Sequence, residues 1–234
     1  MLLKMLRVTG LSSLLLMVML GVAGAADMAF KAPPAPVAST SSWAGLYLGV
    51  EGGAGWAQSR LFIQGTAITT AKYEQSGGLV GGTFGWNVVV SKNFLFGFEA
   101  DGSWTGISKT SSQTTCLFAQ CFTNMQWLNT DRVRAGWLFG AQNQYLAYVT
   151  VGAAGARIQS GQGNGCAPAF CGYHTPFAPV VGAGFEAMIL PKLSAKIEYL
   201  YTSFGDFYSH NPGTAVSVSE RNVNIVRVGL NWHL

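Results

Sequence analysis

Polar and apolar residues alternate along the last stretch of the chain, residues 222–234 (NVNIVRVGLNWHL). Counting back from the C-terminus, every second residue is apolar: Leu234, Trp232, Leu230, Val228 and Val226. The residues between them are mostly polar or small. Because side chains on a strand point alternately to its two faces, this pattern predicts a strand of about ten residues, enough to cross a bilayer when tilted. An apolar outer face and a polar inner face are typical of a transmembrane β-barrel.

Seven further segments upstream also read as strands, and the lengths of their connections alternate. The eight predicted segments are residues 43–58, 78–90, 93–106, 125–140, 145–157, 176–190, 193–205 and 220–234. Connections 91–92, 141–144 and 191–192 are short, and those around residues 59–77, 107–124, 159–175 and 206–219 are long. We therefore expect an all-β fold, an eight-stranded antiparallel up-and-down transmembrane β-barrel with short periplasmic turns and long surface loops. An even number of strands leaves both termini periplasmic.

Composition supports a barrel over a helical membrane protein. Charged residues make up only 10% of the chain, whereas there are 30 glycines and 12% aromatic residues. After residue 26 no apolar run approaches the roughly 18 residues that a spanning helix requires. The net charge of +4 falls once Lys4 and Arg7 are removed with the leader, so nucleic acid is not an expected partner.

The N-terminal region reads as an export signal followed by a linker. Lys4 and Arg7 precede an apolar stretch at residues 11–22 and the small residues Ala23-Gly24-Ala25. This order is typical of a cleaved signal peptide at residues 1–26, and a retained N-terminal anchor is the alternative. Residues 27–42 are rich in proline and alanine and predict an extended periplasmic linker before the barrel, residues 43–234. We expect an integral protein of the outer membrane of a Gram-negative bacterium.

The polar face of the predicted strands carries charges of both signs. The expected lumen set is Glu99, Asp101, Arg132, Arg134, Glu186, Lys196, Glu198 and Arg227, with Glu51 near the rim. Four acids face four bases, and a narrow lumen should hold its charges neutralised because burying an unpaired charge is costly. Two interpretations stay open here: a purely structural charge network, or an ion path that the same residues gate.

Aromatic residues lie near the ends of the segments or on their apolar faces. They are Trp43, Trp56, Trp86, Trp104, Trp137, Tyr199, Tyr201 and Trp232. Aromatic girdles at the two membrane interfaces explain them without a ligand.

Several stretches resemble the small porin-like outer-membrane β-barrels of alphaproteobacteria. They are the Ala25-Ala26-Asp27 end of the leader, the linker Lys31-Ala32-Pro33-Pro34-Ala35-Pro36, the entry Trp43-Ala44-Gly45-Leu46-Tyr47-Leu48-Gly49, and the closing residues 226–232. The resemblance covers the whole chain and implies an architecture like the membrane domain of OmpA. It also implies outer-membrane lipids and the barrel-assembly machinery as partners. That family usually ends in Phe, whereas the corresponding assembly signal here would be Leu230, Trp232 and Leu234.

Four cysteines form two pairs with the same spacing, each inside a predicted surface loop. They are Cys116 and Cys121 in one loop and Cys166 and Cys171 in another. In an exported protein an even number of cysteines favours disulfides, and bonds within each loop are the simplest of three connectivities. A metal or haem site is the rival interpretation, since His174 follows Cys171 closely. We expect disulfides, with no metal site and no cofactor.

The leading functional hypothesis is a porin-like or structural outer-membrane protein, possibly a narrow channel, with a charge-balanced lumen. The alternative is a surface antigen whose loops bind an extracellular ligand, such as haem or a host or phage component. A lipid-modifying enzyme is a third hypothesis, based on the loop residues His174, Asp206, Ser209 and His210. Nucleophile and base must lie within hydrogen-bonding reach for such chemistry, and loops rich in Ser and Thr produce similar groupings by chance. We therefore expect no enzyme.

Overall fold

The computed structural model describes residues 43–63, 72–110, 121–162, 171–209 and 216–234, which form ten β-strands. No helix among these residues is long and apolar enough to span a bilayer. In chain order the strands are β1 (Gly45–Ile63), β2 (Tyr73–Ser91), β3 (Phe94–Thr110), β4 (Cys121–Phe139), β5 (Tyr145–Gln162), β6 (Cys171–His174), β7 (Phe177–Leu190), β8 (Leu193–Thr202), β9 (Gly205–Ser209) and β10 (Val216–His233).

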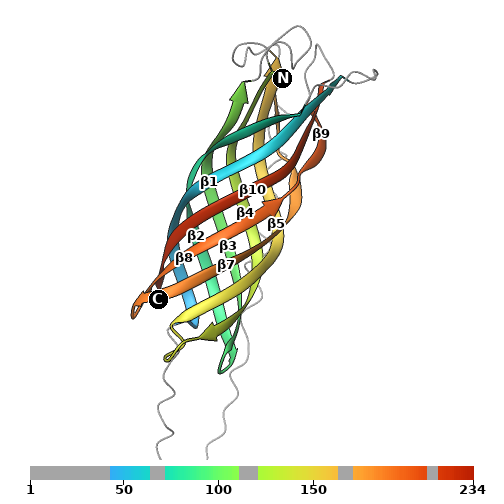
Figure 1. The fold of residues 1–234 in the computed structure, drawn as a ribbon. Coiled ribbons are helices and arrows are strands. Elements are labelled where there is room, and N and C mark those ends of the chain that lie inside the picture. The colour runs from blue at the N-terminus through green and yellow to red at the C-terminus, as the bar shows by residue number, and fades with distance from the viewer. Residues whose placement is uncertain (1–42, 64–71, 111–120, 163–170, 210–215) are drawn as a thin grey trace, which may run out of the picture. The chain divides into compact units, whose positions relative to one another are not determined.

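The strands form one antiparallel sheet that closes on itself. Its order is β1-β2-β3-β4-β5-β7-β8-β10, and β10 then pairs with β1, with Trp232 opposite Leu48. Figure 1 shows these two ends of the sheet side by side. β6 and β7 both pair with β5, and β8 and β9 both pair with β10, so each couple forms one barrel strand in two parts. The prediction of an eight-stranded antiparallel barrel is therefore confirmed.

The two interruptions have local causes. Between β6 and β7 lies Pro176, whose ring nitrogen carries no proton to donate to β5. Where β9 begins after β8, the backbone turns at its first residue, Gly205, where φ is +74°, a conformation that favours glycine. Both interruptions leave the barrel wall continuous, because β5 and β10 run past them.

The strands run further toward the long loops than the alternation predicts. β1 continues to Ile63 and not to residue 58, and β2 begins at Tyr73 and not at residue 78. These added residues are paired, as Ser59 is with Tyr73. The added residues do not alternate, because residues 61–63 are all apolar and residues 74–76 are all polar, so a pattern defined by one apolar face misses them. Because about ten residues of a tilted strand cross a bilayer, the 19 residues of β1 extend the wall beyond the apolar belt at the loop end.

The outer face is apolar, as the alternation predicts. Val80 and Val149 are each 62% exposed, with no protein side chain covering them. Trp127 and Trp137 lie roughly ten residues apart on β4, the length of strand that crosses a bilayer. The two tryptophans therefore mark the upper and lower aromatic levels of the belt, where "upper" denotes the loop end.

The lumen is closed at the short-turn end by apolar side chains, termed the lower cluster. Its members are Trp43, Leu95, Leu138, Leu146 and Tyr148. Trp43 is only 1% exposed, and its indole N–H donates to the backbone oxygen of Asn143 at 2.6 Å. The assignment of Trp43 to a lipid-facing girdle is therefore wrong, because the chain enters β1 from inside the barrel mouth.

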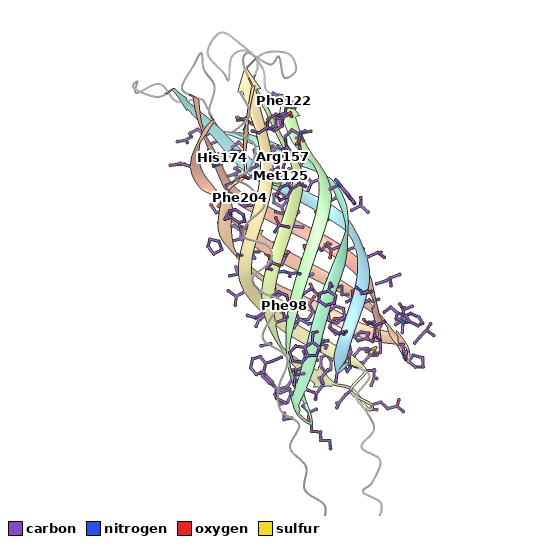
Figure 2. The ribbon with its side chains drawn as sticks, turned by 180° about the vertical axis from the view of Figure 1, so that it is seen from behind. Phe98, Phe122, Met125, Arg157, His174 and Phe204 are labelled. Atoms are coloured by element: carbon purple, nitrogen blue, oxygen red, sulfur yellow. The ribbon has the colours of Figure 1, made fainter. Side chains whose placement is uncertain are left out.

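A larger group of apolar side chains, the upper cluster, fills the lumen toward the loop end. Figure 2 shows two of its members, Met125 and Phe204, in that half of the barrel. The full set is Ala57, Tyr73, Leu79, Ile107, Met125, Leu128, Ala154, Ala156, Ile158, Ala178, Val180, Leu200, Phe204, Val223 and Ile225. The described lumen thus has three layers, with a charged layer between two mainly apolar ones. Buried polar side chains also lie in the outer two layers: Thr123 hydrogen-bonds Tyr73 of the upper cluster, and Asn87 donates to the backbone oxygen of Trp43 in the lower one.

Candidate functional site: the charge network of the lumen

Nine charged side chains meet in the middle layer of the lumen. They come from six strands, because inward-facing positions on all of these strands reach the same level. None of the nine is more than 7% exposed. The members of this central network are Glu51 on β1, Glu99 and Asp101 on β3, Arg132 and Arg134 on β4, Glu186 on β7, Lys196 and Glu198 on β8, and Arg227 on β10.

Arg132 is one of two guanidinium groups at the centre of the network. Its Nη2 lies 2.5 Å from Oε1 of Glu99 and 2.6 Å from Oδ2 of Asp101, and its Nη1 lies 2.7 Å from Oε1 of Glu198. Its Nε donates to the hydroxyl of Thr130 at 2.7 Å. The planar fork of an arginine suits this arrangement, because its donors reach several acceptors at once.

Arg227 is the second central guanidinium. It contacts Glu51 at 2.5 Å, Asp101 at 2.9 Å and Glu198 at 2.7 Å. Asp101 and Glu198 therefore each contact both Arg227 and Arg132. These shared carboxylates connect β3, β4, β8 and β10 directly across the lumen.

Glu51 belongs to the centre of the network, and its expected place near the rim is wrong. Besides Arg227 it faces Lys196, whose Nζ is 3.4 Å from Oε2 of Glu51. The hydroxyls of Thr83 and Ser103 donate to Glu51 at 2.8 and 3.1 Å. Alternation along β1 predicts the face of Glu51 but not its depth, which depends on how β1 is registered against β10.

With Glu51 included, the network holds five carboxylates and four basic groups, so the expected four-to-four balance omits one acid. Phenolic donors supplement the bases. Tyr47 donates to Glu99 at 2.7 Å, and Tyr148 donates to Glu198 at 3.1 Å. Since a buried carboxylate needs a counter-charge or a hydrogen-bond donor, these neutral groups help to stabilise the additional acid.

Arg134 connects the central network to the short-turn end. Its Nη1 is 3.0 Å from Glu186 and 3.5 Å from Glu99. The guanidinium carbon also lies 4.8 and 5.2 Å from the ring centroids of Tyr47 and Tyr148, so two cation–π contacts hold it. Sequence reasoning omitted both tyrosines, although each stands at an inward-facing position of its strand.

The network fills the cross-section of the lumen at its level. An eight-stranded barrel has an interior just wide enough for side chains to occupy it. The apolar layers above and below add constrictions that oppose the entry of ions and water. Within the described part of the chain, no group of three or more His, Cys, Asp or Glu side chains is arranged to hold a metal ion. The chemistry that this geometry supports is cross-linking of the wall by ion pairs.

The expected disulfides involve residues outside the described part of the chain. Cys116 and Cys166 lie there, and the pairing of the four cysteines stays a prediction. The backbone of Cys121 pairs with Gln162 on one side of β5, and that of Cys171 pairs with Gly161 on the other side. β4 and β6 are therefore separated by β5, which places their backbones about 9.5 Å apart. A disulfide requires its two Cα atoms to lie within roughly 7 Å of each other. A Cys121–Cys171 bond is therefore excluded.

The residues of the expected C-terminal assembly signal lie on the outer face of the barrel, at the C-terminal end of β10. Leu230, Trp232 and Leu234 are 45%, 52% and 64% exposed. The N–H of Leu234 donates to the backbone oxygen of Leu46 at 3.0 Å, which joins the last residue to β1. Their recognition by the assembly machinery stays a prediction.

The loop residues considered for lipid chemistry are only partly described. His174 lies in β6 and is labelled near the loop end in Figure 2, and Asp206 lies in β9. His210 lies outside the described residues.

Residues 13–233 match the family described as "Outer membrane protein beta-barrel domain". The chain belongs to this family. It is 29% identical to the 31 kDa outer-membrane immunogenic protein of Brucella melitensis biotype 1, over 89% of this chain and 92% of the relative. It is 28% identical to the 25 kDa outer-membrane immunogenic protein of Brucella abortus biovar 1, over 89% of each. The expected membership of a family of alphaproteobacterial outer-membrane barrels is confirmed.

Solved outer-membrane proteins have a similar shape at low sequence identity. OprG of Pseudomonas aeruginosa matches with a TM-score of 0.49 and 13% identity, over 82% of this chain and 97% of that one. Neisserial surface protein A matches with a TM-score of 0.46 and 14% identity, over 82% and 98%. The fold assignment itself rests on the strand pairing. Family and fold together identify an integral outer-membrane protein of a Gram-negative bacterium.

Proposed function

We propose that this protein is a structural outer-membrane barrel without catalytic activity, whose lumen is closed to solutes. The observation that carries the proposal is the central network, in which nine charged side chains, none more than 7% exposed, pair across the lumen. The upper and lower clusters support it, because they add apolar layers on both sides. The printed names of the two Brucella relatives, immunogenic outer-membrane proteins, agree with a protein displayed at the cell surface.

A narrow channel is the second candidate, favoured by the charges that line the middle of the lumen. Conduction along this path would require ion pairs such as Arg134–Glu186 to separate. The side chains of the upper and lower clusters would also have to move apart. Separating buried charges leaves each one without compensation, at a cost of several kcal/mol. The closed state is therefore the stable one.

Planar-bilayer recording of the refolded protein separates the two candidates. We expect no discrete conductance steps, with folding verified by heat-modifiable gel mobility. Reproducible steps whose size changes in an Arg134→Ala variant would contradict the closed lumen and establish a narrow channel. A matched Arg157→Ala variant, changed on the outer face, controls for non-specific effects of losing an arginine.

We further propose that the short turns and both termini are periplasmic and that the long loops face the exterior. Short periplasmic turns and long external loops are the general pattern of such barrels. The loops would then be the surface that meets any extracellular ligand. Lipids and the barrel-assembly machinery would be the partners within the membrane.

A further inference from the structure

One charged residue lies on the outer face within the apolar belt of β4. Asp131 is exposed there, between Trp127 and Trp137, and it is the only charged side chain on that part of the outer face of β4. Its cross-strand neighbours are Ala100 on β3 and Ala153 on β5, both too small to cover it. Ionisable residues inside a membrane are rare and are normally paired, so this carboxylate calls for a partner.

Asp131 borders a groove in the outer wall. The groove is shallow and wide open, with a volume of about 520 Å³, and Gly82 and Gly102, which pair with each other, form part of its lining. A second hollow of about 280 Å³ beside Trp104 shares Gly102 and Asn129 with it. Small residues on a membrane-facing surface allow another protein surface to approach closely, as in transmembrane interfaces.

The rim of this groove carries a side chain of complementary shape and chemistry. Trp104 is 75% exposed, the largest fraction among the described large apolar side chains. It stands two residues from Gly102 on the same strand. Its indole offers an N–H donor, whereas Asp131 and Asn129 offer oxygen acceptors. A buried tryptophan N–H usually finds such a partner.

We propose that two copies of this chain associate in the membrane as a two-fold dimer, with Trp104 of each copy seated in the groove of the other. In a two-fold dimer both copies use the same surface patch, so the projecting ring and the groove that receives it must lie side by side on each copy, as they do here. A two-fold axis along the barrel direction beside Gly102 places each indole N–H toward the Asp131 carboxylate of the other copy. Acyl chains could fill the groove, but they carry no donor for Asp131. The proposal is independent of whether the lumen conducts.

Single-molecule photobleaching of fluorescently labelled protein in liposomes, over a range of protein-to-lipid ratios, tests this interface. We expect two-step bleaching for the wild type. Trp104→Ala should weaken self-association about 30-fold, the effect of truncating one central aromatic residue in an interface. Gly102→Leu should weaken it similarly by filling the groove. A Cβ added at Gly102 meets no atom within 4 Å, so the barrel itself should tolerate the change.

Two matched variants on the outer face away from the groove control the experiment. Trp137→Ala removes a tryptophan of the lower level, and Ala183→Leu enlarges an exposed small residue on β7, and both should leave the dimer intact. Single-step bleaching of the wild type at every ratio would overturn the proposal and leave lipid as the occupant of the groove. Assemblies larger than two, or equal association of the Trp104→Ala and Trp137→Ala variants, would overturn it too. Heat-modifiable mobility verifies that each variant is folded.

Discussion

Individual charges in the lumen are stable only as members of the central network. Arg132 contacts three carboxylates, and all three also contact Arg227: Asp101 and Glu198 closely, and Glu99 at 3.8 Å. A buried ion pair adds little stability compared with well-packed apolar residues. Removing one partner, by contrast, leaves an uncompensated buried charge. The network therefore stabilises the barrel through its completeness and not through any single pair.

Replacing Arg132 by alanine should lower the free energy of unfolding by about 3–5 kcal/mol, because three carboxylates lose a partner. Urea titration of the protein folded in lipid vesicles measures this change. Arg157→Ala is the matched control, since Arg157 stacks on Tyr173 at 4.6 Å on the outer surface, a contact worth about 1 kcal/mol or less. Equal losses in the two variants would refute the role given to the network.

The glycine at position 184 makes room for the ring of Tyr148, which packs against Arg134. A Cβ at Gly184 would lie 2.4 Å from that ring. We expect Gly184→Ala to cost about 1–3 kcal/mol in the same titration, as overpacking does. Gly102→Ala, where an added Cβ meets nothing within 4 Å, should be nearly neutral. A neutral Gly184→Ala would contradict the tight packing of Tyr148.

At the scale of strands, alternation predicts faces well and depths poorly. The outward set of β10 and the inward charges of β3, β4 and β8 follow directly from period two. The upper cluster could not be predicted, because a register shift between Met125 and Trp127 changes which residues of β4 face inward. In addition, the sequence alone does not distinguish an apolar side chain that faces the lumen from one that faces lipid. The depth of Glu51 depends on strand register, which the sequence of one strand does not contain.

The register of β4, β5 and β6 constrains the cysteine loops. With a Cys121–Cys171 bond excluded, and with each cysteine pair close in sequence, we expect the bonds Cys116–Cys121 and Cys166–Cys171. Mass spectrometry of peptides from the non-reduced protein should recover each bond inside a single loop peptide. Peptides linked between the two loops would refute this connectivity, and fully reduced cysteines would refute disulfides altogether.

At the scale of the whole molecule, exposed lysines at the two ends of the barrel report its orientation. Lys72 and Lys109 are exposed toward the loop end, and Lys92 and Lys192 lie in short turns. An amine reagent that cannot cross the outer membrane should modify Lys72 and Lys109 on intact cells. It should reach the other two only after lysis. The opposite pattern would invert the proposed topology.

Three stacked layers of side chains close the lumen, and water is the smallest molecule that can test this closure. Stopped-flow light scattering measures the osmotic water permeability of liposomes that contain the folded protein. Because mainly apolar layers lie above and below the charged one, we predict that liposomes containing the protein have the same water permeability as protein-free liposomes. A permeability that rises in proportion to the number of barrels per liposome would show that the lumen is open, because it would require a continuous path for water through all three layers.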